Sequence, residues 1–182
     1  NSGSWTHVVV TVSAAAGSAS MKVYKDGTLI GTKTDGHAPN ITTRTNHMIG
    51  KSASGSDGYF EGTIAYLRMW QNYALNDVEV DYLYSVRDDV EIERPTHEWD
   101  LRNITSPTVK DTGVSESKSN GTVYGNLVSN SDGMTFDGVN NYIQLDDIHI
   151  NAEPISFECY ARWDAFNSWS RILDFGNGAG DN

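Results

Sequence analysis

A period-two alternation of apolar and polar residues runs through most of this 182-residue chain, and Gly, Asn and Asp interrupt it at short intervals. Residues 60–70 and 155–163 carry the longest alternating stretches. Because successive side chains of a β-strand point to opposite faces of a sheet, this period is typical of strands. In residues 5–12 both faces are largely apolar or β-branched, which predicts a central strand covered on both sides. We therefore expect an all-β protein of antiparallel strands.

Two local signals add a hairpin and a helix to this pattern. Asp26-Gly27 separates two alternating stretches, and this dipeptide supplies the positive φ angles of a type I′ hairpin turn. Asn76 is a favourable N-cap residue, and Glu79 completes a capping box three residues later. The sequence thus predicts one short helix that starts after Asn76.

The charge balance excludes some classes of partner. Thirteen Lys and Arg residues stand against 24 Asp and Glu residues, so the net charge is −11 and the pI is near 4.7. An acidic surface repels a phosphate backbone, so we expect no nucleic-acid partner. The mean hydropathy is −0.46, and no stretch approaches the ~20 apolar residues of a membrane span, so we expect no membrane insertion.

A charged run divides the chain into two segments. Residues 87–94 are mostly Arg, Asp and Glu, and Pro95 closes the run. Such a run is too charged to bury and is typical of a linker. We predict a first segment over 1–87, a linker over 88–95 and a second segment over 96–182.

Several strings in these segments are similar to one known family. The strings GSWTHVVVTV, MKVYKDGTLIGTKTDG, HMIGKS and GYFEGTIAYLRMW resemble the C-terminal part of a laminin-G-like, concanavalin A-like jelly-roll domain. The strings WDLRN, VKDTG, GMTFDGVNNYIQLD and PISFECYARWDAFNSWSRILDFGNG resemble its N-terminal part. The resemblance implies an antiparallel jelly-roll β-sandwich with one short helix. It also implies that the closing part of one unit precedes the opening part of the next.

Three arrangements explain this reversed order. The chain is a window of a tandem array, a protomer that takes strands from a neighbouring copy, or a circular permutant that folds on itself. Half a sandwich exposes an apolar sheet face and open edges, which invite pairing with another chain. We therefore expect neighbouring copies or repeats of the chain to be its partners, as in the first two arrangements.

The residues that catalysis would need do not form a convincing pattern. Glycosidases of the related fold need two carboxylates about 5–9 Å apart, commonly two residues apart on one strand, and no strand here carries such a pair. Cys159 and His7 fall in core patterns, and His47 and His97 are expected near turns, facing solvent. We expect no enzyme, and a glycoside hydrolase is the least favoured interpretation.

Oxygen-rich loops are candidates for calcium, and laminin-G-like domains often bind this ion at the sandwich edge. We predict three such loops: Asp137 with Asn140 and Asn141, Asp174 with Asn177 and Asp181, and Asp57. The alternative for each is a plain turn, because Asp-Gly and Asn-Asn form turns without a metal.

Other features concern glycans. Trp169 is the best candidate for stacking on a sugar, since Asn and Ser flank it, but a core position is favoured over a sugar contact for this residue. Trp5, Trp70 and Trp163 are expected in the core. Asn40, Asn103 and Asn120 begin Asn-x-Thr sequons, which indicate N-glycosylation and an extracellular or cell-surface location. The single cysteine does not favour an extracellular location, because it allows no internal disulfide, and chains without disulfides are typical of reducing compartments.

These expectations favour a non-catalytic structural or adhesive module, a repeat or subunit of a cell-surface or extracellular filament. The alternative is a carbohydrate-binding, lectin-like module.

Overall fold

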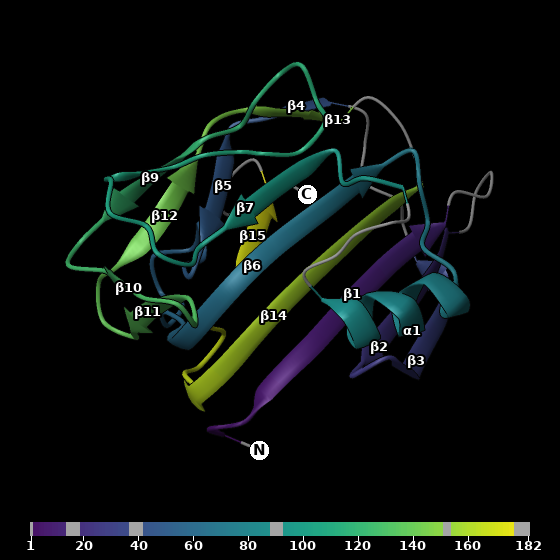
Figure 1. Ribbon diagram of the computed structural model, residues 1–182, viewed down its shortest axis with the longest axis horizontal. Helices are drawn as coiled ribbons and strands as arrows, with labels where there is room; N and C mark the ends of the chain where they lie inside the picture. Colours follow the sequence, from purple (N-terminus) through teal and green to yellow (C-terminus); the bar gives the residue numbers. More distant parts are fainter. Residues whose placement is uncertain (1, 14–18, 37–41, 88–92, 151–153, 177–182) are drawn as a thin grey trace.

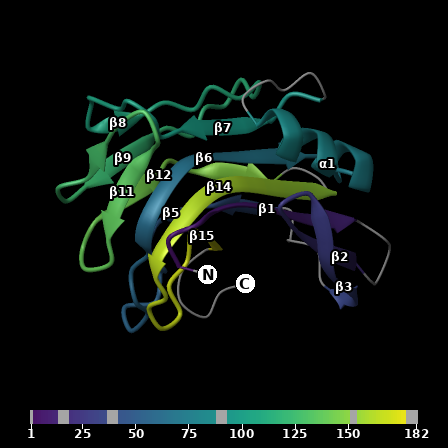
Figure 2. The same ribbon diagram turned by 60° about the horizontal axis from the view of Figure 1, so that its bottom comes forward.

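The computed structural model describes residues 2–13, 19–36, 42–87, 93–150 and 154–176 and places most of them in two layers of antiparallel strands (Figure 1). The larger sheet has eight strands and the smaller has five. A separate two-stranded sheet pairs β4 (Thr42–Arg44) with β13 (Ile148–Ile150). One α-helix, α1 (Asp77–Val86), lies against the outside of the larger sheet (Figure 2). This is the expected all-β sandwich with one short helix.

The larger sheet has the order β10-β11-β6-β14-β1-β2-β3, and β7 pairs with β6 beside β11. Its strands are β1 (Trp5–Ser13), β2 (Ala19–Lys25), β3 (Thr28–Gly36), β6 (Glu61–Gln71), β7 (His97–Asp100), β10 (Val128–Ser129), β11 (Met134–Asp137) and β14 (Ile155–Ala165). The smaller sheet has the order β15-β5-β12-β9-β8. Its strands are β5 (Asn46–Ile49), β8 (Thr108–Val109), β9 (Gly121–Tyr124), β12 (Tyr142–Leu145) and β15 (Leu173–Gly176).

The two predicted segments interleave in both sheets. Strand β14 of the second segment lies between β6 and β1 of the first, and β12 and β15 of the second segment lie on either side of β5 of the first. The main core therefore contains residues of both segments, such as Ile64 of β6 and Ile143 of β12, which have no exposed surface. The described strands form one sandwich, as in a chain that folds on itself.

The apolar sheet faces that were expected to need a neighbouring copy are covered within the chain. Each segment covers the apolar sheet face of the other, so the described strands need no second copy for that purpose. Most of the linker, residues 88–92, lies outside the described residues. It remains a prediction that residues 1–87 correspond to the C-terminal part of one family unit and residues 96–182 to the N-terminal part of the next.

The local predictions for the hairpin and the helix are confirmed. Asp26 and Gly27 have φ angles of 48° and 77° between β2 and β3. Asn76 caps α1, and Glu79 completes the capping box. The buried Ser156 of β14 fixes the approach to the helix, because its Oγ accepts a hydrogen bond from the Leu75 amide and donates one to a carbonyl nearby. A second apolar cluster holds α1 on the outer face of the sheet.

Two of the histidines were placed wrongly by the sequence. His47 and His97 are 0% and 3% exposed, because their rings pack into the structure instead of facing solvent. His47 stacks on Phe175, and burial lowers its pKa. His97 shares a hydrogen bond of 2.6 Å with Asp111, a residue that also accepts bonds from three backbone amides. Cys159 is buried as expected, and His7 is fully buried too.

A cavity in either segment should destabilise the whole sandwich. Ile64→Ala and Ile143→Ala each remove a fully buried side chain from the same core. We expect each variant to unfold in one cooperative transition and to lose about 2–5 kcal/mol of unfolding free energy, measured by urea denaturation with fluorescence and far-UV circular dichroism. Ile30→Ala, at a 61% exposed position of β3, is the control and should change stability by less than about 0.5 kcal/mol. Two transitions, each moved by only one variant, would contradict a shared core.

Asp111 makes the free energy of unfolding depend on pH. Burial disfavours its ionised form, but hydrogen bonds from His97 and from backbone amides outweigh burial and lower the pKa of Asp111. A carboxylate with a lowered folded pKa stabilises the protein above its unfolded pKa of about 3.9, and this contribution disappears as the pH falls. Asp111→Asn should therefore cost about 1–3 kcal/mol at pH 7 and progressively less below about pH 4, by urea denaturation. A loss that stays constant with pH, or an equal loss in the exposed control Asp147→Asn, would contradict this role.

Candidate functional site

The loops that carry most of the predicted ligand-binding residues meet at one end of the sandwich. We call residues 50–60, 137–141 and 166–174 the loop rim. The Gly58 amide donates to the Ser168 carbonyl at 2.8 Å, and the Asn167 side chain donates to the Tyr59 carbonyl at 3.0 Å. Gly138 approaches so closely that a Cβ there would lie 2.8 Å from the Asn167 side-chain nitrogen. The fold therefore brings together residues that are far apart in the sequence.

The first predicted calcium loop is a turn fixed by its own hydrogen bonds. Asp137 Oδ1 accepts from the amides of Val139 and Asn140 at 2.9 and 3.2 Å, and these backbone bonds lower the pKa of Asp137. Asn141 Oδ1 accepts from the Asp137 amide at 3.0 Å. The turn leads from β11 in the larger sheet to β12 in the smaller one.

The other two predicted loops converge on an arginine. The Arg171 guanidinium lies 3.3 Å from Asp57 Oδ2 and 2.7 Å from Asp174 Oδ2, and Asp174 also accepts from the Ala53 amide. Asn177 and Asp181, which the sequence joined to this loop, lie outside the described residues. Within the described ranges no three His, Cys, Asp or Glu side chains gather as a metal-binding group. Calcium binding at the loop rim stays a prediction.

Trp169 is 75% exposed and has a φ of 56°, so the core position that the sequence favoured for it is wrong. Phe166, three residues earlier, is 70% exposed, and Val139 of the neighbouring turn is 68% exposed. Hydrogen bonds hold the backbone beneath these side chains, as described for Gly58 and Asn167. Two exposed aromatic rings beside polar groups can stack on the apolar face of a ligand.

The sequons differ in their surroundings. Asn103 is exposed, with a φ of 54°, and its side chain is open to modification. Asn120 is half-buried, and its side-chain oxygen accepts from the Asp111 amide at 3.1 Å. Asn40 lies outside the described residues.

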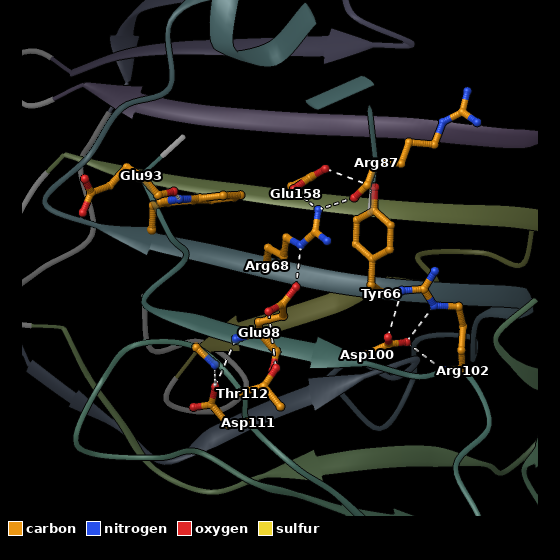
Figure 3. Close-up of polar contacts among 12 residues, drawn as sticks. Tyr66, Arg68, Arg87, Glu93, Glu98, Asp100, Arg102, Asp111, Thr112 and Glu158 are labelled. Carbon is orange, nitrogen blue, oxygen red and sulfur yellow. Dashed lines mark hydrogen bonds and ion pairs between the residues drawn. The ribbon is translucent and has the colours of Figure 1, made fainter. Parts of the chain in front are cut away.

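A buried polar row crosses the outer face of the larger sheet, and no pattern in the sequence predicts it. Glu158, Arg68 and Glu98 are direct neighbours on β14, β6 and β7, because the strand register pairs each with the next (Figure 3). Arg68 binds Glu98 at 2.7 Å through Nε and Glu158 at 3.3 Å through Nη1. Glu158 also accepts from His7 Nε2 at 2.8 Å and from the Tyr66 hydroxyl at 3.2 Å.

The electrostatics of this row are those of a structural ion cluster. Burial opposes the charge of Arg68, but Glu158 outweighs it and raises the pKa of Arg68. Burial, reinforced by the charge of Glu158, raises the pKa of the Tyr66 hydroxyl. Glu158 is 1% exposed, so its carboxylate has no access to a substrate. The three residues of the row lie on three different strands, so the alternation within any one strand does not reveal it.

Loss of the central cation should be costly. Arg68→Met removes the cation between two carboxylates, so we expect a loss of about 3–5 kcal/mol in unfolding free energy, measured by urea denaturation. Arg162→Met is the matched control, because the Arg162–Asp164 pair is about one-third exposed and should contribute less than about 1 kcal/mol. A second substitution, Glu158→Gln, should restore part of the Arg68→Met loss. Equal losses at Arg68 and Arg162 would contradict this assignment.

Among the described residues, no helix is long and apolar enough to cross a membrane. No curated protein and no solved structure matches the chain. A family model does match: residues 1–81 fit Laminin_G_3, described as the concanavalin A-like lectin/glucanases superfamily. The antiparallel sandwich agrees with this match. Residues 1–81 are therefore similar to the concanavalin A-like lectin/glucanase superfamily, and the described strands of the whole chain form an all-β, antiparallel jelly-roll sandwich.

Proposed function

We propose that this chain is a non-catalytic, extracellular, lectin-like module that binds a glycan at the loop rim. The observation that carries the proposal is the exposure of Phe166 and Trp169, 70% and 75%, on a loop that hydrogen bonds hold in place. Aromatic rings stack on the C–H faces of sugars, and a fixed loop loses little entropy on binding. Polar side chains at the same rim, such as Asn167 and Asn140, supply hydrogen-bonding partners for hydroxyl groups.

The carboxylates support a binding role over a hydrolytic one. Glu158 is buried and bonded to three partners, and Asp57 and Asp174 both form ion pairs with Arg171. A glycosidase needs one carboxyl group to donate a proton and a second to attack or to activate water beside the same bond. These contacts do not favour such a pair.

The proposal is tested on a glycan array. Trp169→Ala and Phe166→Ala should each reduce binding at least tenfold, because each removes one stacking ring. Val128→Ala, at a 65% exposed position of β10, is the control and should bind as the unmodified protein does. Arrays run with calcium and with a chelator also test the predicted role of Asp137 and Asn140 in holding calcium. Binding that survives both rim substitutions would overturn the proposal.

A structural or adhesive role is the second candidate, and a different feature favours it. Strand β3 is the last strand of the larger sheet, and all its residues before Gly36 are exposed, including Leu29 and Ile30. An exposed edge strand offers backbone groups for pairing with another copy. Such assembly would appear as a concentration-dependent mass in light scattering, lost in Ile30→Pro and unaffected by Trp169→Ala.

A further inference from the structure

A small pocket opens on the outer face of the larger sheet, beside the C-terminal end of α1. Its volume is about 270 Å³. Trp5, Tyr66 and Tyr160 supply aromatic walls, Arg87 and Arg102 supply cations, and Asp132 supplies a carboxylate. Sites for drug-sized ligands span about 300–1,000 Å³, so this pocket suits a ligand of about one sugar ring. It shares no residue with the loop rim.

Arg87 differs from the other arginines on this face. Arg68 forms ion pairs with Glu98 and Glu158. Arg102 pairs with Asp100, and Arg162 pairs with Asp164. Arg87 has no carboxylate partner among the described residues, and its buried Nε has no hydrogen-bond partner there. A buried donor without a partner costs free energy unless a ligand or water satisfies it. The unused hydrogen-bonding capacity of Arg87 points to an anion.

The position of Arg87 is fixed by the surrounding structure. Its carbonyl accepts from Arg68 Nη1 at 2.8 Å, and its side chain extends away from Glu158 (Figure 3). Its amide caps α1 by donating to the Leu83 carbonyl at 2.8 Å. The guanidinium lies 5.1 Å from the ring centroids of both Tyr84 and Tyr160. A guanidinium held between rings is preorganised for a two-pronged contact with a carboxylate.

The walls restrict the ligand further. Trp5 stacks on Tyr160 with centroids 4.8 Å apart and planes at 22°, which gives the pocket a continuous aromatic wall. Asp132, which is exposed, can accept hydrogen bonds from hydroxyl groups. This carboxylate and the net charge of −11 repel a polyanion. The ligand class that fits carries one anionic group, several hydroxyl groups and an apolar face.

We propose that this pocket binds a single carboxylated sugar ring, whose carboxylate pairs with Arg87 and whose apolar face lies on Trp5 or Tyr160. The inference does not depend on glycan binding at the loop rim, because the two sites have different residues and different chemistry.

The test compares acidic and neutral sugars of the same shape. Methyl β-D-glucuronide and methyl α-D-galacturonide are titrated against the full chain by calorimetry, with Trp fluorescence as a second readout. The corresponding methyl glucoside and galactoside replace the carboxylate with a hydroxymethyl group. We expect at least one acidic sugar to bind about tenfold or more tightly than its neutral counterpart, because charge-assisted hydrogen bonds to Arg87 are lost in the neutral sugar.

Substitutions assign the binding to Arg87. Arg87→Gln should weaken acidic-sugar binding about tenfold or more, and Arg87→Lys, which keeps the charge, should weaken it less. Trp169→Ala at the loop rim is the control and should leave it unchanged. Thermal melts verify that each variant is folded; if Arg87→Gln does not fold, Arg87→Lys and the neutral sugars decide the outcome. Absence of binding by both acidic sugars, equal binding of neutral sugars, or full binding by folded Arg87→Gln would overturn the proposal.

Discussion

The pairing of β14 with β6 on one side and β1 on the other is the interaction on which the rest of the structure depends. One face of β14 contributes Cys159 and Ala161 to the core between the sheets. The opposite face contributes Ser156, which anchors the approach to α1, and Glu158, which anchors the polar row. A single strand from the second segment thus organises both the apolar core and the helix-covered face of the first.

The sequence predicted single elements well because their signals are local. Asp26-Gly27 sets its own turn, Asn76 and Glu79 form a capping box within four residues, and the two faces of β14 follow from its alternation. The same alternation does not say which strand lies next to which. The sequence therefore left three arrangements of the two segments open. In the structure the described strands of the two segments lie next to one another in both sheets.

The candidate sites show the same limit. The sequence selected Asp57, Asp137, Asp174 and Trp169 by residue type, and the fold places them all at one end of the sandwich. Their interactions could not be predicted, because Arg171 is remote from Asp57 in the chain and the exposure of Trp169 depends on which loops meet beneath it. The row of Glu158, Arg68 and Glu98 also needed the strand register. Which of these residues interact, and which are exposed, depends on contacts between segments that are distant in the sequence, and residue type alone does not determine those contacts.

The central place of β14 has a consequence for how the protein is made. Strand β6 ends at Gln71, but β14, which joins it to β1, begins only at Ile155. On the ribosome the first segment must wait for more than eighty further residues before its two central strands can be joined. During that interval the edges of β1 and β6 that pair with β14 have no partner strand, so the nascent chain is exposed to aggregation at this stage of synthesis.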